Sequence, residues 1–428
     1  MMLIEFSVQN FRSFYDRVTF SMEASNRSEH PEHVIEVSRQ KLLKSSALYG
    51  ANASGKSNLF KAFIFMKEMV LSSSKDTQAG EAIPVEAFLL NTQGAQEPTT
   101  MEVIYLVDDI LYRYGFSCSA KRVEKEWLYS RNTRPRSREL RLFERDFRGN
   151  YHSHPSFKEA KGSLQVFLRE NTLLISLLAQ FNGETSRLIL DCFINTNIWD
   201  LDFYMPLHTS LMIQKELVPP AWVREFLINA DLGIKDFQIE EKELSWDKLR
   251  SIPAAIKEDT NKYLSHSIST SHEYFDENSG EFKRLLFDLE KQESSGTKQF
   301  FSMAGVIYYA LQHGGCLLID ELEKSLHPLL CRIIIRLFQD PQTNPKGAQL
   351  IFSTHDTTLL DKALFRRDEL WFVEKDSDCS SDLYSLVEYK MEKGKARNDS
   401  SYGKDYIRGK YGAIPYTKYD DFAKLFRK

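Results

Sequence analysis

Residues 50–57, GANASGKS, constrain the fold more than any other segment of this chain. They fit Gly-x-x-x-x-Gly-Lys-[Ser/Thr], in which glycines allow consecutive backbone N–H groups to wrap around a phosphate. The segment SSALY before the loop is typical of a short buried strand, and SNLFKAFIFMKEMV after it is typical of an amphipathic helix. A strand, a glycine loop and a helix in this order predict a phosphate-binding loop at a helix N-terminus.

The residue types in this loop predict separate roles. Lys56 supplies a positive charge for the β- and γ-phosphates of ATP and is counted among the catalytic residues, while the Ser57 hydroxyl becomes a Mg²⁺ ligand. ATP and Mg²⁺ are therefore the expected cofactors. The other nucleotide-binding residues expected here are Gly50, Asn52, Ala53, Ser54, Gly55 and Asn58.

Two later apolar segments predict strands that end in polar groups. GGCLLIDELEKSLHP ends its strand at Asp320 and Glu321, and LIFSTHD carries His355 just past its strand. Ligands of an open α/β sheet bind at the carboxyl edge of its strands. Asp320 is expected to hold Mg²⁺ with Ser57, and Glu321 to act on the attacking water. His355 is expected to hydrogen-bond the γ-phosphate or that water. Solvated acids and a histidine at a strand end are the simpler alternatives.

A second anion-receptive helix start is predicted at Ser294, Ser295, Gly296 and Thr297, directly before a long apolar-periodic segment. These residues would also serve as an ordinary helix cap. One nucleotide does not need two such helix ends, whereas two facing subunits would each donate theirs to the other's ATP. We therefore expect a dimer, or a higher homo-oligomer, with ATP between the subunits.

The order of these motifs resembles the ABC-type ATPase heads of RecF, SMC proteins and related ATPases. In that resemblance Ser294 matches the serine and Gly296 the second glycine of the LSGGQ signature, while Ser295 and Thr297 replace its first glycine and its glutamine. The signature therefore departs from the transporter form.

Three further segments bear on this resemblance. SLHP lies where the D-loop falls, so Ser325 and His327 are implied at a dimer interface. The opening VQNFRSF is similar to the first strand of RecF and SMC heads, which implies that Arg12 and Ser13 approach the nucleotide. Gln93 is the available Q-loop candidate, and no role is assigned to it.

The whole chain resembles stand-alone ABC-type, AAA-family ATPases of bacterial phage defence, of the RloA, AbiL, PtuA and PARIS-ATPase kind. The segments that carry this are LYGANASGKSN, ESSGT, LLIDELEKSLHP, FSTHD and YIRGKYGAIPY. Nucleases of the overcoming-lysogenisation family carry a similar head followed by a Toprim domain, whereas about 70 residues follow His355 here. The resemblance thus implies an ATP-dependent sensor or switch that controls a separate effector, a nuclease or toxin.

The expected fold class is α/β, a P-loop NTPase of ABC-ATPase type with an N-terminal antiparallel β meander. We expect the head to comprise residues 1–150 and 275–428, and a mainly helical insertion to occupy residues 151–274. The scattered cysteines fit a reducing cytosol. We expect a cytoplasmic protein without a membrane segment, because no export signal is visible and the longest apolar run, LLISLLA, cannot span a bilayer.

Residues 131–148 contain seven arginines against three acids, although the net charge of the chain is −4. A solvated basic surface explains this run, and so does contact with nucleic acid or an acidic partner. Two other functions therefore stay open. One is a RecF-like DNA-repair ATPase that binds duplex DNA, and the other is an ATP-binding assembly scaffold with little turnover.

Overall fold

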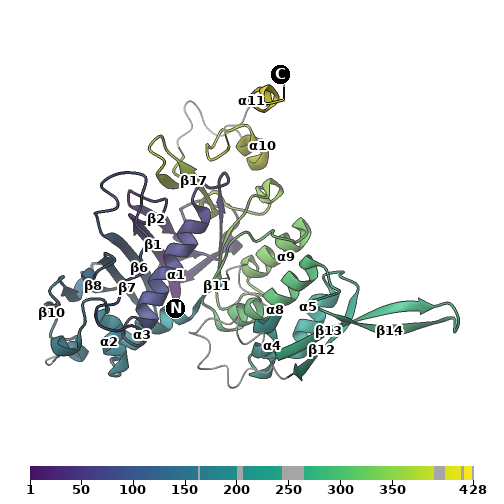
Figure 1. Ribbon diagram of the computed structural model, residues 1–428, viewed down its shortest axis with the longest axis horizontal. Helices are drawn as coiled ribbons and strands as arrows, with labels where there is room; N and C mark the ends of the chain where they lie inside the picture. Colours follow the sequence, from purple (N-terminus) through teal and green to yellow (C-terminus); the bar gives the residue numbers. More distant parts are fainter. Residues whose placement is uncertain (162–163, 200–205, 243–264, 390–400, 416–418, 427–428) are drawn as a thin grey trace. The chain divides into compact units, whose positions relative to one another are not determined.

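The structure is a computed structural model that describes residues 1–428 except 162–163, 200–205, 243–264, 390–400, 416–418 and 427–428 (Figure 1). The chain forms two compact units. The first unit comprises Met1–Asp200, His313–Glu323 and Arg332–Lys428, and the second comprises Leu201–Gln312 and Lys324–Cys331.

The first unit begins with an antiparallel sheet of seven strands in the order β10-β9-β8-β7-β6-β1-β2. All neighbours pair antiparallel, and β6 and β7 are joined by a hairpin turn at Asp108 and Asp109. The strands are β1 Met2–Gln9, β2 Val18–Ser21, β6 Thr99–Val107, β7 Ile110–Cys118, β8 Val123–Asn132, β9 Leu140–Arg145 and β10 Tyr151–Ser153.

A second sheet of the same unit has six strands in the order β11-β15-β16-β5-β17-β18. Its neighbours pair parallel except β17 with β18. The strands are β11 Thr196–Trp199, β15 Cys316–Ile319, β16 Gln349–Ser353, β5 Ser45–Tyr49, β17 Leu370–Lys375 and β18 Ser381–Ser385. Strands β5, β15 and β16 are buried along their whole length, as expected for parallel strands covered on both faces. Because β15, β16 and β5 are adjacent, the ends of the three motif-bearing strands meet at one edge.

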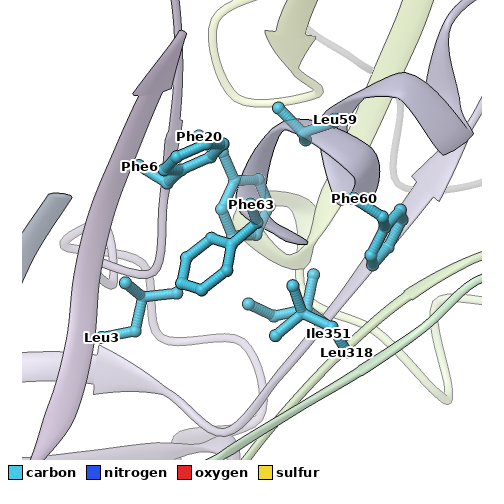
Figure 2. Close-up of a pocket in the computed structure, with 8 residues that line it drawn as sticks. All are labelled: Leu3, Phe6, Phe20, Leu59, Phe60, Phe63, Leu318 and Ile351. Carbon is cyan, nitrogen blue, oxygen red and sulfur yellow. The ribbon is translucent and has the colours of Figure 1, made fainter. Parts of the chain in front are cut away.

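Helix α1, Lys56–Ser72, packs between the two sheets. Figure 2 shows its side chains meeting those of both sheets around a small apolar gap. The lining residues are Leu3, Phe6 and Phe20 from β1 and β2, Leu59, Phe60 and Phe63 from α1, and Leu318 and Ile351 from β15 and β16. This shared apolar layer holds the N-terminus of α1 at the carboxyl end of β5. The predicted α/β class with an antiparallel β meander is confirmed.

Shorter elements complete the first unit. They are β3 Val34–Val37, β4 Gln40–Leu43, α2 Leu174–Gln180, α3 Glu184–Ile194, α10 Tyr402–Ile407, α11 Tyr419–Lys424, and the 3₁₀ turns η1 Pro31–His33, η2 Lys158–Ala160, η3 Leu164–Phe167, η5 Thr357–Leu359 and η6 Arg367–Glu369. Helix α9, Pro328–Gln339, begins in the second unit and continues in the first.

The second unit contains helices and a three-stranded antiparallel sheet in the order β12-β13-β14. Figure 1 shows β13 and β14 as a long hairpin. The elements are α4 Pro206–Gln214, α5 Pro220–Ile228, β12 Ile234–Lys242, β13 Ser265–Asp276, β14 Glu281–Asp288 and α8 Ser295–His313, whose last residue belongs to the first unit. The segment 151–274 thus contributes α2 to α5 and also strands, and its boundaries as an insertion stay a prediction. Among the described residues, no helix is both long and apolar enough to cross a bilayer.

Candidate functional site

The two glycines of the 50–57 loop lie too close to neighbouring atoms to be replaced by a residue with a side chain. Gly55 has a φ of +119°, and a Cβ there would lie 2.5 Å from the Ser381 hydroxyl and 2.7 Å from the Ser13 hydroxyl. A Cβ on Gly50 would lie 2.4 Å from the carbonyl oxygen of Val373. The loop backbone is therefore packed against neighbouring strands at positions where no side chain fits.

Two segments distant in sequence hold this loop. The Ser381 hydroxyl donates to the Ser54 carbonyl oxygen at 2.5 Å, and the Ser381 N–H donates to the Ser13 carbonyl oxygen at 2.7 Å. Asn58 Nδ2 donates to the Ser13 hydroxyl at 2.9 Å. The structure thus places Ser13 against the loop, and its expected approach to the nucleotide stays a prediction. The sequence analysis did not identify Ser381, because nothing in the residues around it indicates a contact with the loop.

Arg12, the neighbour of Ser13, has Glu86 as its partner. Its backbone N–H donates to the Glu86 carbonyl oxygen at 2.8 Å, and its guanidinium forms an ion pair with the Glu86 carboxylate. Its φ of +50° lies in the left-handed region. The proposed contact of Arg12 with a nucleotide stays a prediction.

Lys56 is buried at the first position of α1, with 5% of its surface exposed. Its Nζ donates to the carbonyl oxygens of Gly50 at 2.9 Å and Ala51 at 3.0 Å. Burial lowers the pKa of Lys56 to about 8, although the carboxylates of Asp320, Glu321 and Glu323 act in the opposite direction. The ammonium therefore lies in a poorly solvated position where an additional anion would stabilise its charge.

The other loop residues differ in their exposure to solvent. The Ser54 hydroxyl is buried without a hydrogen-bond partner among the described residues, whereas Asn52 and Ala53 are exposed and Ser57 is half-buried. Ala53 has a φ of +59°. An unpaired buried hydroxyl beside an exposed loop is a polar group that a bound ligand can satisfy.

Asp320 and Glu321 follow β15 directly, and Ser353 at the end of β16 bonds to both. The Ser353 hydroxyl donates to Asp320 Oδ1 and accepts the Glu321 N–H at 2.8 Å. Glu321 has a φ of +53°, which is sparsely populated for a residue with a side chain. The two acids are therefore positioned by the neighbouring strand.

Glu323 is a third acid at this edge, and the sequence analysis missed it. Its Oε1 accepts the His355 N–H at 2.5 Å, and its Oε2 is buried without a partner in the described structure. Burial, and then the charge of Lys56, lower the pKa of His355, which keeps its imidazole neutral near pH 7. The position of Glu323 two residues after Glu321 was the sequence feature that could have indicated it.

The predicted signature lies in the second unit, at the start of α8. The Ser294 hydroxyl accepts the Thr297 N–H at 3.1 Å and bonds the Thr297 hydroxyl at 2.9 Å, so it caps the helix. A Cβ on Gly296 would lie 2.5 Å from the Ser325 carbonyl oxygen. Ser295 is exposed. Gly296 is therefore required for packing within its own chain, and Ser295 presents a side chain to solvent.

Two D-loop candidates belong to the same unit. Ser325 has a φ of +61°, and His327 Nδ1 accepts the Leu329 N–H at 3.2 Å near the start of α9. Both residues are exposed. Their expected place at a dimer interface stays a prediction.

Not every arginine of residues 131–148 lies on the surface. Arg145 is 2% exposed and pairs with buried Glu126, whose carboxylate also accepts the N–H groups of Leu174 and Ile175 at the start of α2. The buried carboxylate thus accepts hydrogen bonds from this helix N-terminus, and Arg145 balances its charge. Arg145 is therefore not part of the basic surface. The exposed members are Arg131, Arg134, Arg136, Arg138, Arg141 and Arg148.

The sheet edge fits a nucleotide with a divalent cation. Gly50 and Gly55 leave no room for a side chain, the Ser54 hydroxyl lacks a partner, and Lys56 is buried opposite three acids. Serine and carboxylate oxygens such as those of Ser57 and Asp320 are ligands that Mg²⁺ prefers. Together with the β5–loop–α1 order, these features define a P-loop NTPase.

The chain belongs to the family described as AAA domain, putative AbiEii toxin, Type IV TA system, which matches residues 45–361. This range begins at the first residue of β5 and extends beyond His355. It therefore includes every predicted site residue except Arg12 and Ser13. A search of curated proteins gave no significant match.

Solved structures similar to the chain include SMC heads and RecF. An SMC head bound to the C-terminal winged-helix domain of ScpA is 12% identical, with a TM-score of 0.45 over 90% of this chain and 97% of that one. The SMC head domain from Thermotoga maritima is 14% identical, with a TM-score of 0.40 over 90% and 99%. The recombination mediator RecF with ATP is 13% identical, with a TM-score of 0.32 over 89% and 97%. These values are too low to transfer a function.

Proposed function

We propose that this protein is a Mg²⁺-dependent ATPase whose reaction takes place at the carboxyl edge of β5, β15 and β16. The observation that carries the proposal is the electrostatic coupling of one buried lysine, Lys56, with the acids that follow β15, and of His355 with both. Perturbed ionisable groups gathered at a loop that excludes side chains are characteristic of functional sites.

Each residue then has a role in holding or activating the substrate. The backbone of residues 50–57 and the Lys56 ammonium would bind the ATP phosphates, and Lys56 would exchange its bonds to Gly50 and Ala51 for bonds to phosphate oxygens. Ser57 and Asp320 would hold Mg²⁺, which neutralises phosphate charge when bound. Hydrogen bonds from and to Ser353 keep Asp320 and Glu321 in place.

Glu321 is the proposed general base that accepts a proton from the attacking water. Neutral His355 would orient that water or donate a hydrogen bond to the γ-phosphate. Glu323 positions His355, because its carboxylate accepts the backbone N–H of that residue at 2.5 Å. The base and its neighbours therefore directly follow two adjacent strands of one sheet.

Substitution of Lys56 tests the binding site. Because a hydrogen bond to a charged group contributes about 1.5–3 kcal/mol, Lys56→Ala is expected to weaken ATP binding about 10- to 100-fold. Isothermal titration calorimetry with MgATP measures this. Lys75→Ala, at an exposed lysine beyond the end of α1, is the matched control. Equal affinity of Lys56→Ala and the control would overturn the assignment.

We further propose that two copies enclose ATP and that the start of α8 from one copy approaches the nucleotide of the other. The exposed Ser295 in the first turn of a long helix supports this, since free N–H groups at a helix N-terminus favour an anion. ATP-dependent dimerisation with negligible turnover would instead indicate an assembly scaffold.

The biological role we propose is a cytoplasmic switch in bacterial phage defence, in which the ATP state controls a separate nuclease or toxin effector. The family description, which names a putative toxin of a toxin–antitoxin system, and the motif resemblance support it. Affinity purification of the protein from its native host, with ATP present, would test this role. We expect an effector protein that co-purifies with Glu321→Gln and does not co-purify with Lys56→Ala. The same set of co-purifying proteins from both variants would contradict the switch.

Binding to duplex DNA is a second candidate, favoured by the exposed arginines of residues 131–148. Contacts with phosphates would make such binding strongly dependent on salt. Combined replacement of Arg134, Arg136 and Arg138 by serine should then remove DNA binding and any stimulation of turnover by DNA. A wild-type protein that neither binds DNA nor responds to it excludes the RecF-like function.

A further inference from the structure

Outside the ATP site, a group of metal-ligating side chains lies on the turn that precedes β3. His30, Glu32 and His33 offer one ligand atom each, and these atoms lie within 4.8 Å of one another. The Glu32 Oε1 atom is 3.0 Å from His30 Nδ1 and 3.7 Å from His33 Nε2. His33 is buried, His30 is half-buried and Glu32 is exposed, so the group is open to solvent on one side.

The outward nitrogen of each imidazole already has an acceptor. His30 Nε2 is 2.7 Å from the carbonyl oxygen of Lys362, and His33 Nδ1 is 3.0 Å from Glu369 Oε2. The Glu369 carboxylate also accepts the Ser45 hydroxyl at 2.7 Å and the Arg366 N–H at 2.7 Å. Because the carbonyl and this carboxylate accept hydrogen bonds, each ring donates its outward N–H to them.

The inward nitrogens, His30 Nδ1 and His33 Nε2, are then the lone-pair atoms of the neutral rings. Both face Glu32, whose oxygens are also acceptors. At 3.0 Å, His30 Nδ1 and Glu32 Oε1 are two acceptors in contact, which a cation between them, either a proton or a metal ion, would stabilise. Carboxylate or carbonyl acceptors behind the rings are the usual outer partners of metal-bound histidines, since they orient the ring and raise its basicity.

Negative charge gathers at this position, because the Glu32 carboxylate faces both rings and the Glu369 carboxylate accepts a hydrogen bond from His33. One cation opposes this, since Lys44 Nζ donates to the Glu32 carbonyl oxygen at 2.8 Å. Lys44 also donates to the Gln339 carbonyl oxygen at 3.1 Å.

We propose that His30, Glu32 and His33 bind one divalent transition-metal ion of the Zn²⁺ class, with water completing the shell. Two imidazole nitrogens and a carboxylate oxygen form a donor set that suits Zn²⁺ better than Mg²⁺ or Ca²⁺. Tetrahedral ligands 2.0–2.1 Å from zinc are about 3.3 Å apart, so the 3.7 Å between His33 Nε2 and Glu32 Oε1 has to shorten by about 0.4 Å, while the 3.0 Å between His30 Nδ1 and Glu32 Oε1 has to lengthen slightly. The exposed Glu32 side chain and the half-buried His30 ring can make that movement.

The site would act as a structural clamp. Its outer partners come from Lys362 and Glu369, and Glu369 accepts the hydroxyl of Ser45, the first residue of β5. The ion would therefore fasten the 30–33 turn to the opposite end of the strand that carries the phosphate loop. This role is independent of ATP hydrolysis.

Zinc titration of the full chain tests the proposal. The protein is stripped with a chelator, kept free of nucleotide and titrated with Zn²⁺ by calorimetry, and its melting temperature is followed. We expect one equivalent bound and a higher melting temperature, because an ion that binds the folded state stabilises it. Glu32→Gln should weaken binding more than about 100-fold, since even outer-shell changes cost 10- to 100-fold.

Matched variants separate this site from others. Glu36→Gln, at an exposed glutamate of β3, and Asp320→Asn, at the predicted Mg²⁺ site, should both retain the bound equivalent. His30→Gln should lose it and serves as a second ligand variant if Glu32→Gln folds poorly. Zinc affinity unchanged in Glu32→Gln and His30→Gln, or absent from the wild type, overturns the proposal.

Discussion

The sheet edge around Lys56 and the first turn of α8 are both proposed to contact phosphate, yet different interactions hold them. At the sheet edge, Ser381 bonds Ser54 across 327 residues of sequence. At the start of α8, Ser294 bonds Thr297 three residues away. The sheet edge depends on contacts between distant strands, whereas the Ser294 cap of α8 is local in sequence. The proposed role of α8 in phosphate binding rests on a second subunit, which would bring its own ATP to this helix end.

The largest expected effect tests the chemistry of the sheet edge. Glu321→Gln keeps the shape of the side chain and removes the proposed base, so turnover should fall 10²- to 10⁴-fold while MgATP still binds. Phosphate release and calorimetry measure the two quantities. Glu290→Gln, at an exposed glutamate, should behave as wild type. Normal turnover in Glu321→Gln would place the base elsewhere, with Glu323 as the first alternative.

A smaller effect is expected at α8. Ser295→Glu adds a negative charge that the helix N-terminus tolerates in its own chain, so folding and the binding of one MgATP per subunit should persist. Across a dimer interface the same charge would repel phosphate at a cost of several kcal/mol, which predicts at least about a tenfold loss of turnover. Ser295→Ala is the mild control.

Mixing experiments then decide whether the turn of α8 acts between subunits. A mixed dimer of Ser295→Glu and Lys56→Ala contains one site with neither change, so mixing the two impaired variants should restore part of the turnover. If Ser295→Glu alone has full activity, α8 takes no part in the site, and the sheet edge functions as the ATPase site of a single subunit.

The pKa of Lys56, about 8 without nucleotide, predicts how ATP binding depends on pH. Bound phosphate favours the charged ammonium, so binding takes up a proton once the pH exceeds that pKa. ATP affinity should be constant below about pH 7 and weaken about tenfold per pH unit above pH 8. Calorimetry at several pH values measures this. Lys56→Arg stays charged and should lose the dependence, and a parallel decline in both proteins would contradict it.

The smallest effect should come from the support of the loop by β18. Ser381→Ala removes the hydroxyl that bonds the Ser54 carbonyl, and a hydrogen bond of about 1 kcal/mol corresponds to about fivefold weaker ATP binding. Ser377→Ala, at an exposed serine before β18, is the control. Equal affinities of the two variants would show that the loop does not depend on its distant contacts.

The sequence by itself determined the elements that carry the site. Gly50, Gly55 and Lys56 between an apolar strand and an amphipathic helix predicted β5, the loop and α1. The apolar runs before Asp320 and His355 predicted β15 and β16. These predictions succeed because they rest on interactions within a few residues, namely the backbone freedom of glycine, helical periodicity and strand burial.

Only the tertiary structure decided which distant groups complete the site. Ser381 and Ser353 bond the loop and the acids across sheet neighbours, and Glu323 reaches the N–H of His355. Arg145, one of a run of arginines, is buried against Glu126 because the carboxylate also caps α2. Such pairings depend on strand order and on which polar groups burial leaves to be satisfied, and neither is encoded in a local pattern.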